Sequence, residues 1–338
     1  MRLFFLSIGS LFLFMSCRIQ QKTVEPEITY PAAYVINGGE NSISVINLNT
    51  LKVEKNQFLP NHGDRYAHHI YTSPDQKKLA IAMPSYDFSQ GHSGLHGTDL
   101  KGGIAIVDSR TLAILASWDT PFANHNAVFS PNGTEIWTAT HAHNGELLVY
   151  GYPETQLLHR ANLGPDPGEL VITPTNQLFV NLGESSFVAR VPVQTKEEAK
   201  MIKVDLFPTS VWPGNDTLLI VENKHQKSIN FIDLRTNQAV EALDLTFTPG
   251  YTAFIDNELW ICQPKTNRVH IFEKQMGQWI AQSIIEAQAD AHAIGQYKEN
   301  VLVVNQQGHS VSVFNQKTKQ LIQHIPVGFK PNGLAIIP

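Results

Sequence analysis

A pattern of short apolar strands separated by polar turns recurs along the chain at intervals of about 40 to 45 residues. The first copy holds the predicted strand segments 33–37 and 41–47, and the last holds the segments 301–305 and 310–315; seven copies can be aligned. A period of this length with several strands in each unit is typical of a β-propeller. We therefore expect an all-β, seven-bladed β-propeller whose blades surround one axis.

Each repeat can be divided into four strands, which we label a to d from the axis outward. Apolar residues run almost continuously through strands b and c, as expected for sheets that neighbouring blades cover on both faces. The predicted b strands are Tyr34–Ile36, Leu79–Ala82, Ile136–Ala139, Leu178–Asn181, Leu218–Val221, Leu259–Cys262 and Val301–Val304. The turn after strand c often opens with Asn or Asp, whose side chain can bond to the backbone two residues on. These turn residues are Asn47, Asp108, Asp233 and Asn315.

The order of strands predicts how the ring closes. The first copy begins with a b strand, and residues 331–337 supply an a strand that no b strand follows. We expect Leu334–Ile337 to pair with Tyr34–Ile36 in the first blade. This pairing joins the two ends of the chain and leaves no open edge between the first and last blades.

The first 17 residues resemble the signal peptide of a bacterial lipoprotein. Met1-Arg2 is positive, residues 3–15 are apolar but shorter than the roughly 20 residues that span a bilayer, and Ser16-Cys17 places a small residue before a cysteine. The resemblance implies cleavage before Cys17 and lipidation of that residue. The alternative is an ordinary signal peptide with an incidental cysteine. Residues 18–32 read as a polar tether, and residues 33–338 as the propeller.

The lipoprotein resemblance implies a protein of the cell envelope, attached to the outer membrane through a lipid anchor only. Residues 18–21 lack the acidic run that often follows the lipidated cysteine of surface-exported lipoproteins, which favours the periplasmic side. The chain has 25 Lys+Arg and 30 Asp+Glu, a formal net charge of -5, and no nucleic-acid-binding motif. We therefore expect no nucleic-acid partner. Cys262 lies in an apolar strand and is predicted to be a buried small hydrophobe, which leaves no disulfide.

Residues 34–37, 42–47 and 325–333 resemble the YVTN-type seven-bladed propeller family. This family includes surface-layer proteins, secreted binding proteins and relatives of the nitrite- and nitrous-oxide-reductase propellers, so the resemblance implies a fold and leaves the function open. The His68-His69 pair resembles the copper-site region of nitrous-oxide reductases. Those enzymes carry a cupredoxin domain after the propeller, whereas this chain ends with the propeller. It also lacks the Cys-x-x-Cys-His motif of attached haem.

The histidines are distributed unevenly. The b-to-c and d-to-a connections share one face, which we call the mouth, and 11 of the 14 histidines fall there by this assignment. No turn predicted for the opposite face contains a histidine. The second and third repeats are richest, and the insertion 84–103 adds two histidines among several glycines, as expected of a loop. The candidate metal-binding residues are His68, His69, His125, His141, His143, His92 and His96.

Neutral imidazole is a common ligand of zinc, copper, iron and nickel, so this cluster predicts a site for a divalent transition metal, Cu or Zn. Two alternatives stay open: the imidazoles contact a ligand without metal, or they are ordinary polar loop residues. Further ligands, or partners of the ligands, could be Asp64, Asp87, Asp99 and Glu169.

Two functions fit these observations. The first is a membrane-tethered, non-catalytic binding protein of the envelope, whose mouth binds a small ligand, a metal or a partner protein. The second is a metal-dependent enzyme or electron-transfer accessory that uses the histidine cluster. Catalysis at a metal needs an open coordination position and nearby acid–base groups.

Overall fold

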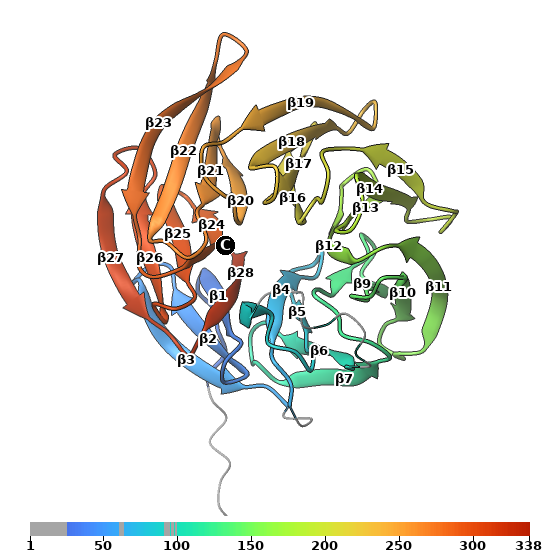
Figure 1. The fold of residues 1–338 in the computed structure, drawn as a ribbon. Coiled ribbons are helices and arrows are strands. Elements are labelled where there is room, and N and C mark those ends of the chain that lie inside the picture. Colours follow the sequence, from blue (N-terminus) through green and yellow to red (C-terminus); the bar gives the residue numbers. More distant parts are fainter. Residues whose placement is uncertain (1–25, 61–63, 91–94, 96–97, 99) are drawn as a thin grey trace, which may run out of the picture.

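In the computed structural model, which describes residues 26–60, 64–90, 95, 98 and 100–338, seven four-stranded sheets surround one axis (Figure 1). The all-β class and the seven-bladed ring predicted from the repeats are confirmed. From the axis outward, blade 1 holds β28 (Pro331–Ile337), β1 (Ala32–Asn37), β2 (Ser42–Asn47) and β3 (Lys52–Phe58); blade 2 holds β4 (His68–Thr72), β5 (Lys78–Ala82), β6 (Gly102–Asp108) and β7 (Ile114–Thr120); blade 3 holds β8 (Val128–Phe129), β9 (Glu135–Ala139), β10 (Gly145–Gly151) and β11 (Leu157–Gly164).

The remaining blades follow the same order. Blade 4 holds β12 (Pro167–Ile172), β13 (Gln177–Leu182), β14 (Phe187–Pro192) and β15 (Lys200–Lys203); blade 5 holds β16 (Ser210–Asn215), β17 (Leu218–Asn223), β18 (Ser228–Asp233) and β19 (Gln238–Asp244); blade 6 holds β20 (Thr252–Ile255), β21 (Glu258–Cys262), β22 (Arg268–Gln275) and β23 (Gln278–Glu286); blade 7 holds β24 (Ala291–Tyr297), β25 (Asn300–Asn305), β26 (Ser310–Asn315) and β27 (Leu321–Pro326). A short 3-10 helix, η1 (Phe88–Gln90), lies in the insertion between β5 and β6.

The hydrophobic core is divided among the spaces between blades. All six residues of β2 are buried, whereas the outermost strand β3 alternates between exposed and half-buried residues. Among the described residues, seven hydrophobic clusters each combine two neighbouring blades; one of them packs Trp137 of blade 3 against Leu178 of blade 4. Stability therefore depends on an unbroken ring, because each blade needs both neighbours to cover its two faces.

The predicted ring closure is confirmed. β28 pairs with β1 in antiparallel register, with Tyr34 opposite Ala335 and Val35 opposite Leu334. The predicted turns also form: Asn47 Oδ1 accepts a hydrogen bond from the Asn49 backbone N–H at 2.9 Å, and Asp108 Oδ1 accepts one from Arg110 at 2.9 Å.

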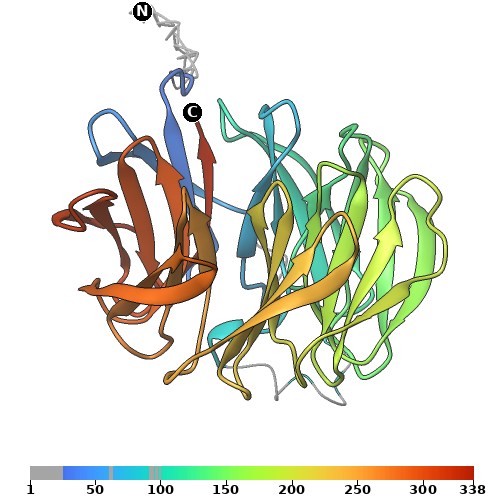
Figure 2. The same ribbon diagram turned by 90° about the horizontal axis from the view of Figure 1, so that it is seen from above.

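The two faces of the ring carry different features. The C-terminus and the first described residues lie at one face, and the cyan η1 segment lies at the other (Figure 2). Ile28 is buried and its backbone N–H donates a hydrogen bond to the Arg110 carbonyl at 2.8 Å, so this part of the predicted tether 18–32 contacts blade 2. The predicted signal peptide and Cys17 lie outside the described residues.

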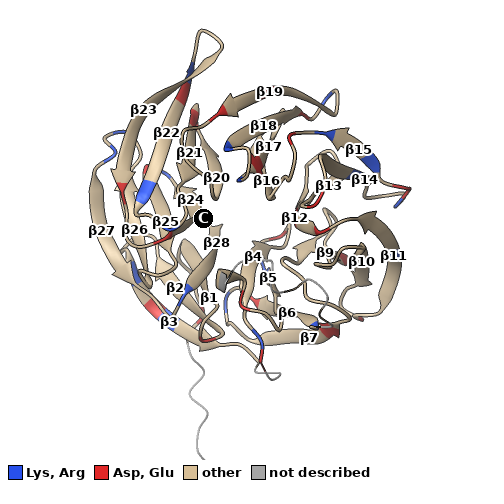
Figure 3. Cartoon of the chain, in the orientation of Figure 1, with Lys and Arg blue, Asp and Glu red and all other residues tan. Residues whose placement is uncertain are grey.

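Residues of both charges are distributed around the ring rather than segregated (Figure 3). Within the part of the chain that the structure describes, no helix has the length and hydrophobicity that crossing a bilayer requires.

Candidate metal centre

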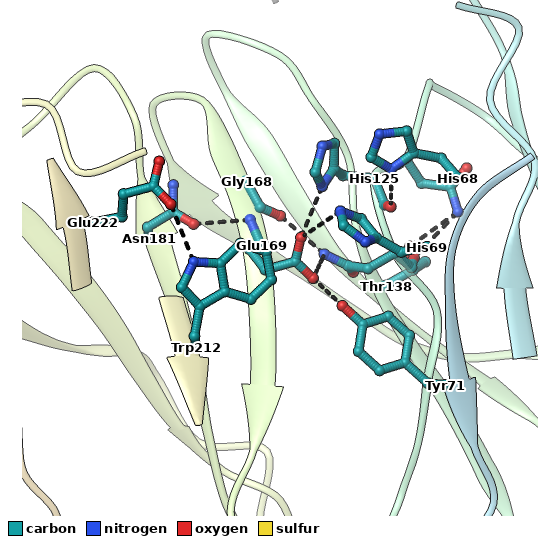
Figure 4. A network of polar contacts seen from close by, with 12 residues as sticks. His68, His69, Tyr71, His125, Thr138, Gly168, Glu169, Asn181, Trp212 and Glu222 are labelled. Carbon is teal, nitrogen blue, oxygen red and sulfur yellow. Dashed lines mark hydrogen bonds and ion pairs between the residues drawn. The ribbon is translucent and has the colours of Figure 1, made fainter. Parts of the chain in front are cut away.

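Three imidazoles from two blades converge at the mouth end of the axis (Figure 4). His68 and His69 begin β4, and His125 precedes β8. One ligand atom from each lies within 4.8 Å of the other two. The ring centroids of His68 and His125 are 4.2 Å apart, and those of His69 and His125 are 4.8 Å apart. All three residues are buried, so their ring nitrogens lie where water has limited access.

A β-bulge explains how two consecutive residues of one strand reach the same site. Neighbouring side chains on a regular strand point to opposite faces. In β4, however, His68 pairs with Ala82 and Ile70 pairs with Ile81, so His69 is an extra residue without a place in the ladder. His69 also has a positive φ of 48°, which is uncommon for a residue other than glycine. The bulge redirects its side chain toward that of His68.

His125 is held by the residue before it. The Asn124 side chain accepts a hydrogen bond from the Gly103 backbone N–H and donates one to the Gly103 carbonyl, each at 3.1 Å. This fixes the start of the third blade's inner strand against β6 of the second. The His125 backbone carbonyl in turn lies 3.3 Å from Nδ1 of His68.

The Glu169 carboxylate contacts two of the three imidazoles. Its Oε2 lies 2.9 Å from Nδ1 of His125 and 3.3 Å from Nε2 of His69. Its Oε1 accepts hydrogen bonds from Tyr71 Oη and from Asn126 Nδ2. When His125 donates through Nδ1, the lone pair of that ring is on Nε2, which is the arrangement in which a carboxylate orients a metal-ligating histidine.

An irregularity in the backbone of β12 positions this carboxylate near the axis. Pro167 pairs with Leu182 and Leu170 pairs with Val180, so the ladder is interrupted at Gly168 and Glu169. The Glu169 backbone N–H donates to Asn181 Oδ1 at 2.8 Å. A Cβ at Gly168 would lie 2.7 Å from Asn181 Nδ2, which also donates to the Pro208 carbonyl at 3.0 Å, so a larger residue would displace a hydrogen-bonded amide.

Burial dominates the electrostatics of the site. It raises the pKa of Glu169 to about 8, although hydrogen bonds from Tyr71 and Asn126 oppose the shift. Burial also lowers the pKa of His68 well below its ordinary value, and His69 and His292 add to that effect. Desolvation raises the pKa of Tyr71 well above its ordinary value, with Glu169 contributing. Burial therefore favours the neutral imidazole of His68, the form of histidine that binds metals.

The other candidate residues are placed differently. His141 is buried, its ring centroid lies 5.4 Å from that of His125, and its Nδ1 lies 2.9 Å from Asp166 Oδ1. His143 has a largely exposed side chain whose Nδ1 lies 2.6 Å from Glu184 Oε2, so the two residues do not share one environment. His92 and His96 lie outside the described residues.

A cavity of about 470 Å³ opens at the mouth above the cluster. The three clustered imidazoles, His141 and Asp166 line one side of it, and Phe88 of η1 covers them with its ring centroid 4.7 Å from that of His125. His292 of blade 7 also lines the cavity, and its ring centroid lies 6.5 Å from those of His68 and His69.

Other residues that line the cavity are charged or aromatic. Glu222 is buried and accepts a hydrogen bond from Trp212 Nε1 at 3.1 Å; Lys224 Nζ lies 3.5 Å from its other oxygen. The Trp212 and Tyr251 rings are in contact, with centroids 4.2 Å apart. A molecule in this cavity would therefore meet imidazoles, a carboxylate paired with Lys224, and aromatic rings.

Two features of the site were not fully anticipated from the sequence. Glu169 was one of four acidic candidates, and only the bulge in β12 distinguishes it as the residue that joins two imidazoles. Asp87 instead pairs with Lys330 Nζ at 2.9 Å. The sequence assigned His292 to the mouth but not to the cluster. The feature that could have identified it is its position at the start of an inner strand, which is equivalent to that of His69.

Comparisons with known proteins agree on the fold. No family model and no curated protein matches the sequence. Among solved structures, the chain is similar to a functionally unknown protein from Desulfotomaculum acetoxidans, with a TM-score of 0.72, 12% identity, and coverage of 90% of this chain and 98% of the other. It is also similar to a putative 6-phosphogluconolactonase from Bacteroides fragilis, with a TM-score of 0.71, 14% identity, and coverage of 94% and 99%.

A third similar structure is the dihydro-haem d1 dehydrogenase NirN in complex with DHE, with a TM-score of 0.60, 11% identity, and coverage of 90% of this chain and 74% of the other. At such identities the likeness concerns the fold alone. The YVTN resemblance thus rests on the three sequence motifs, and what the comparisons support is the seven-bladed β-propeller.

Proposed function

We propose that this protein is a metal-binding β-propeller of the bacterial envelope, and that His68, His69 and His125 hold one divalent transition metal ion, Cu²⁺ or Zn²⁺. The observation that carries the proposal is the convergence of three buried imidazoles within 4.8 Å, two of them in contact with one buried carboxylate.

The donor set indicates the class of metal. Three imidazole nitrogens suit zinc, copper, nickel and iron, whereas calcium and magnesium prefer oxygen ligands. Glu169 would orient two of the rings, in the manner of the carboxylates that support metal-ligating histidines. A metal with three protein ligands keeps a coordination position for another molecule, and the adjoining cavity is where that molecule would lie.

The binding role follows from the position of the site. The mouth presents loops from many blades on a rigid ring, which suits recognition of a small ligand or a partner protein of the envelope. Attachment to the outer membrane through lipidated Cys17 belongs to the same proposal. A site in the periplasm would be exposed to the metal ions that enter that compartment.

A metal-dependent enzyme is the second candidate, and one observation favours it. His141 and Asp166 form a hydrogen-bonded pair that lines the same cavity, 5.4 Å from His125 by ring centroids. An imidazole oriented by a carboxylate is a common general acid or base. Such a group beside the open coordination position could move a proton to or from a bound molecule.

Metal binding by the purified, chelator-stripped protein tests the proposal. We expect one equivalent of Cu²⁺ or Zn²⁺ to bind at pH 7.5, measured by competition with a chromophoric chelator, and we expect the double variant His68→Ala/His125→Ala to lose that binding. The control, His143→Ala/His225→Ala, removes two imidazoles from the same face. The proposal is wrong if the wild type binds neither metal, or if the control loses as much affinity as the test variant.

A further inference from the structure

We infer that the C-terminal strand β28 is part of the metal centre, because Asn332 and Gly333 position the backbone that carries His68 and His69. The inference rests on the proposed function and names residues from the opposite end of the chain, more than 250 positions away in sequence. Two independent contacts support it: a hydrogen-bonded clamp on Ala67 and a close backbone approach to His69.

The clamp surrounds the residue immediately before the ligand pair. Asn332 is buried, and its Nδ2 donates a hydrogen bond to the Ala67 carbonyl at 3.0 Å. The Ala67 backbone N–H donates to Asn41 Oδ1 at 2.6 Å, and Asn41 Nδ2 donates to the Arg65 carbonyl. Both polar groups of the Ala67 backbone are therefore held by side chains of blade 1.

The close approach is at Gly333. A Cβ on this residue would lie 2.8 Å from His69 Cα and 3.2 Å from both His69 C and Ile70 N, all of them backbone atoms. Backbone atoms cannot rotate aside as the end of a side chain can. Gly333 is not among the residues with positive φ, so alanine suits its own conformation and the cost arises from collision with His69.

The two strands fit together through irregularities in both. β28 has a break in register between Gly333 and Pro331 opposite β1, and β4 has its bulge at His69. The left-handed conformation of His69 is costly in isolation and persists where neighbouring structure enforces it. Since ligand positions must hold within about 0.5 Å, a small displacement of β28 is enough to spoil the geometry. The pairing that closes the ring and the geometry of the metal centre are thus coupled.

Two substitutions test the role of β28 in the full-length protein. Gly333→Ala pushes directly on His69, and Asn332→Ala removes one half of the clamp without adding atoms. The matched control is Gly295→Ala in β24, whose Cβ would lie 2.8 Å from Leu334 Cδ2 and 2.9 Å from Ile336 Cδ1, the flexible ends of side chains on the same strand β28. The readouts are the Kd for Zn²⁺, the Cu²⁺ electron paramagnetic resonance spectrum and the urea midpoint of the metal-free protein.

We expect Gly333→Ala to weaken Zn²⁺ binding about 10- to 100-fold, as loss of support for ligands usually does, and to change the Cu²⁺ spectrum. Asn332→Ala should weaken binding by a smaller factor in the same direction, and it decides the question if Gly333→Ala fails to fold. Gly295→Ala should lower the urea midpoint while keeping the wild-type Kd and spectrum. The inference is overturned if the β28 variants lower stability but bind Zn²⁺ as the wild type does, or if all three variants lose affinity equally. If the wild type itself binds no metal, the proposed function is wrong, and this inference is wrong with it.

Discussion

Tyr71 Oη donates a hydrogen bond to Oε1 of Glu169, while Oε2 of the same carboxylate contacts His69 and His125. The two oxygens of one buried side chain thus play different roles, because the protein holds Oε1 in place and Oε2 orients the imidazoles. Glu169 therefore links the Tyr71 hydroxyl to two of the three clustered histidines.

The first prediction concerns Glu169→Gln. The amide keeps the volume of the side chain but cannot ionise to the carboxylate that would accept hydrogen bonds from both imidazoles once they bind a metal, so we expect affinity for Zn²⁺ to fall about 10- to 100-fold. Competition with a chromophoric chelator measures the change. Glu184→Gln is the control, because Glu184 contacts the largely exposed His143. Equal affinities for Glu169→Gln and the wild type would remove Glu169 from the site.

The second prediction concerns the pH dependence of stability without metal. Burial raises the pKa of Glu169 to about 8, above the ordinary carboxyl value. Between that ordinary value and about 8, the folded state holds a proton that the unfolded state has lost. The contribution of Glu169 to the free energy of unfolding therefore falls as pH rises through this window, by up to about 1.4 kcal/mol per pH unit.

Comparison with Glu169→Gln isolates this effect. The lowered pKa of His68 acts in the opposite sense, because its folded state binds fewer protons and gains stability as pH rises toward its ordinary value. That contribution is common to both proteins. We expect the urea midpoint of the wild type, in chelator, to fall relative to that of Glu169→Gln between pH 6 and 8. Parallel curves for the two proteins would contradict the raised pKa.

The third prediction concerns ring closure. Deleting residues 331–338 removes β28, exposes the edge of β1 and uncovers the apolar side chains that pack on it. We expect the truncated protein to unfold at a markedly lower temperature than the wild type or to fail to fold. Removing Pro338 alone, which lies beyond β28, serves as control. A truncated protein that melts with the wild type would show that blade 1 is stable with three strands.

The fourth prediction concerns attachment to the membrane. If Cys17 is lipidated, Cys17→Ser prevents acylation and should move the protein from the membrane fraction to the soluble fraction of the cell. Immunoblots of separated fractions measure the distribution, and Cys262→Ser, which changes a buried cysteine of the propeller, is the control. Retention of the Cys17 variant in the membrane fraction would require a different anchor.

The sequence predicted the architecture better than the site. Apolar runs such as Leu79–Ala82 and turn residues such as Asn47 are local signals, and seven copies of them reinforce one another. The pairing of Leu334–Ile337 with the first blade followed from counting strands. These features depend on periodicity, which a single chain displays directly.

The site depends on departures from that periodicity. The bulges that aim His69 and Glu169 at one point each insert residues into a strand without a distinctive local pattern. Alternation on a regular strand would have placed His141 and His143 side by side, yet one is buried and the other exposed. The collision that makes Gly333 necessary involves residues from opposite ends of the chain, which local sequence cannot relate.

The packing of Ile28 against blade 2 has a practical consequence for anyone who immobilises or labels this protein. The first described residues and the end of β28 emerge at the face opposite to η1, so a tag on the C-terminus points away from the imidazoles (Figure 2). If Cys17 carries a lipid, as proposed, the 11 peptide steps from it to Ile28 reach at most about 40 Å, and the tether would join the ring at the face opposite to the cavity.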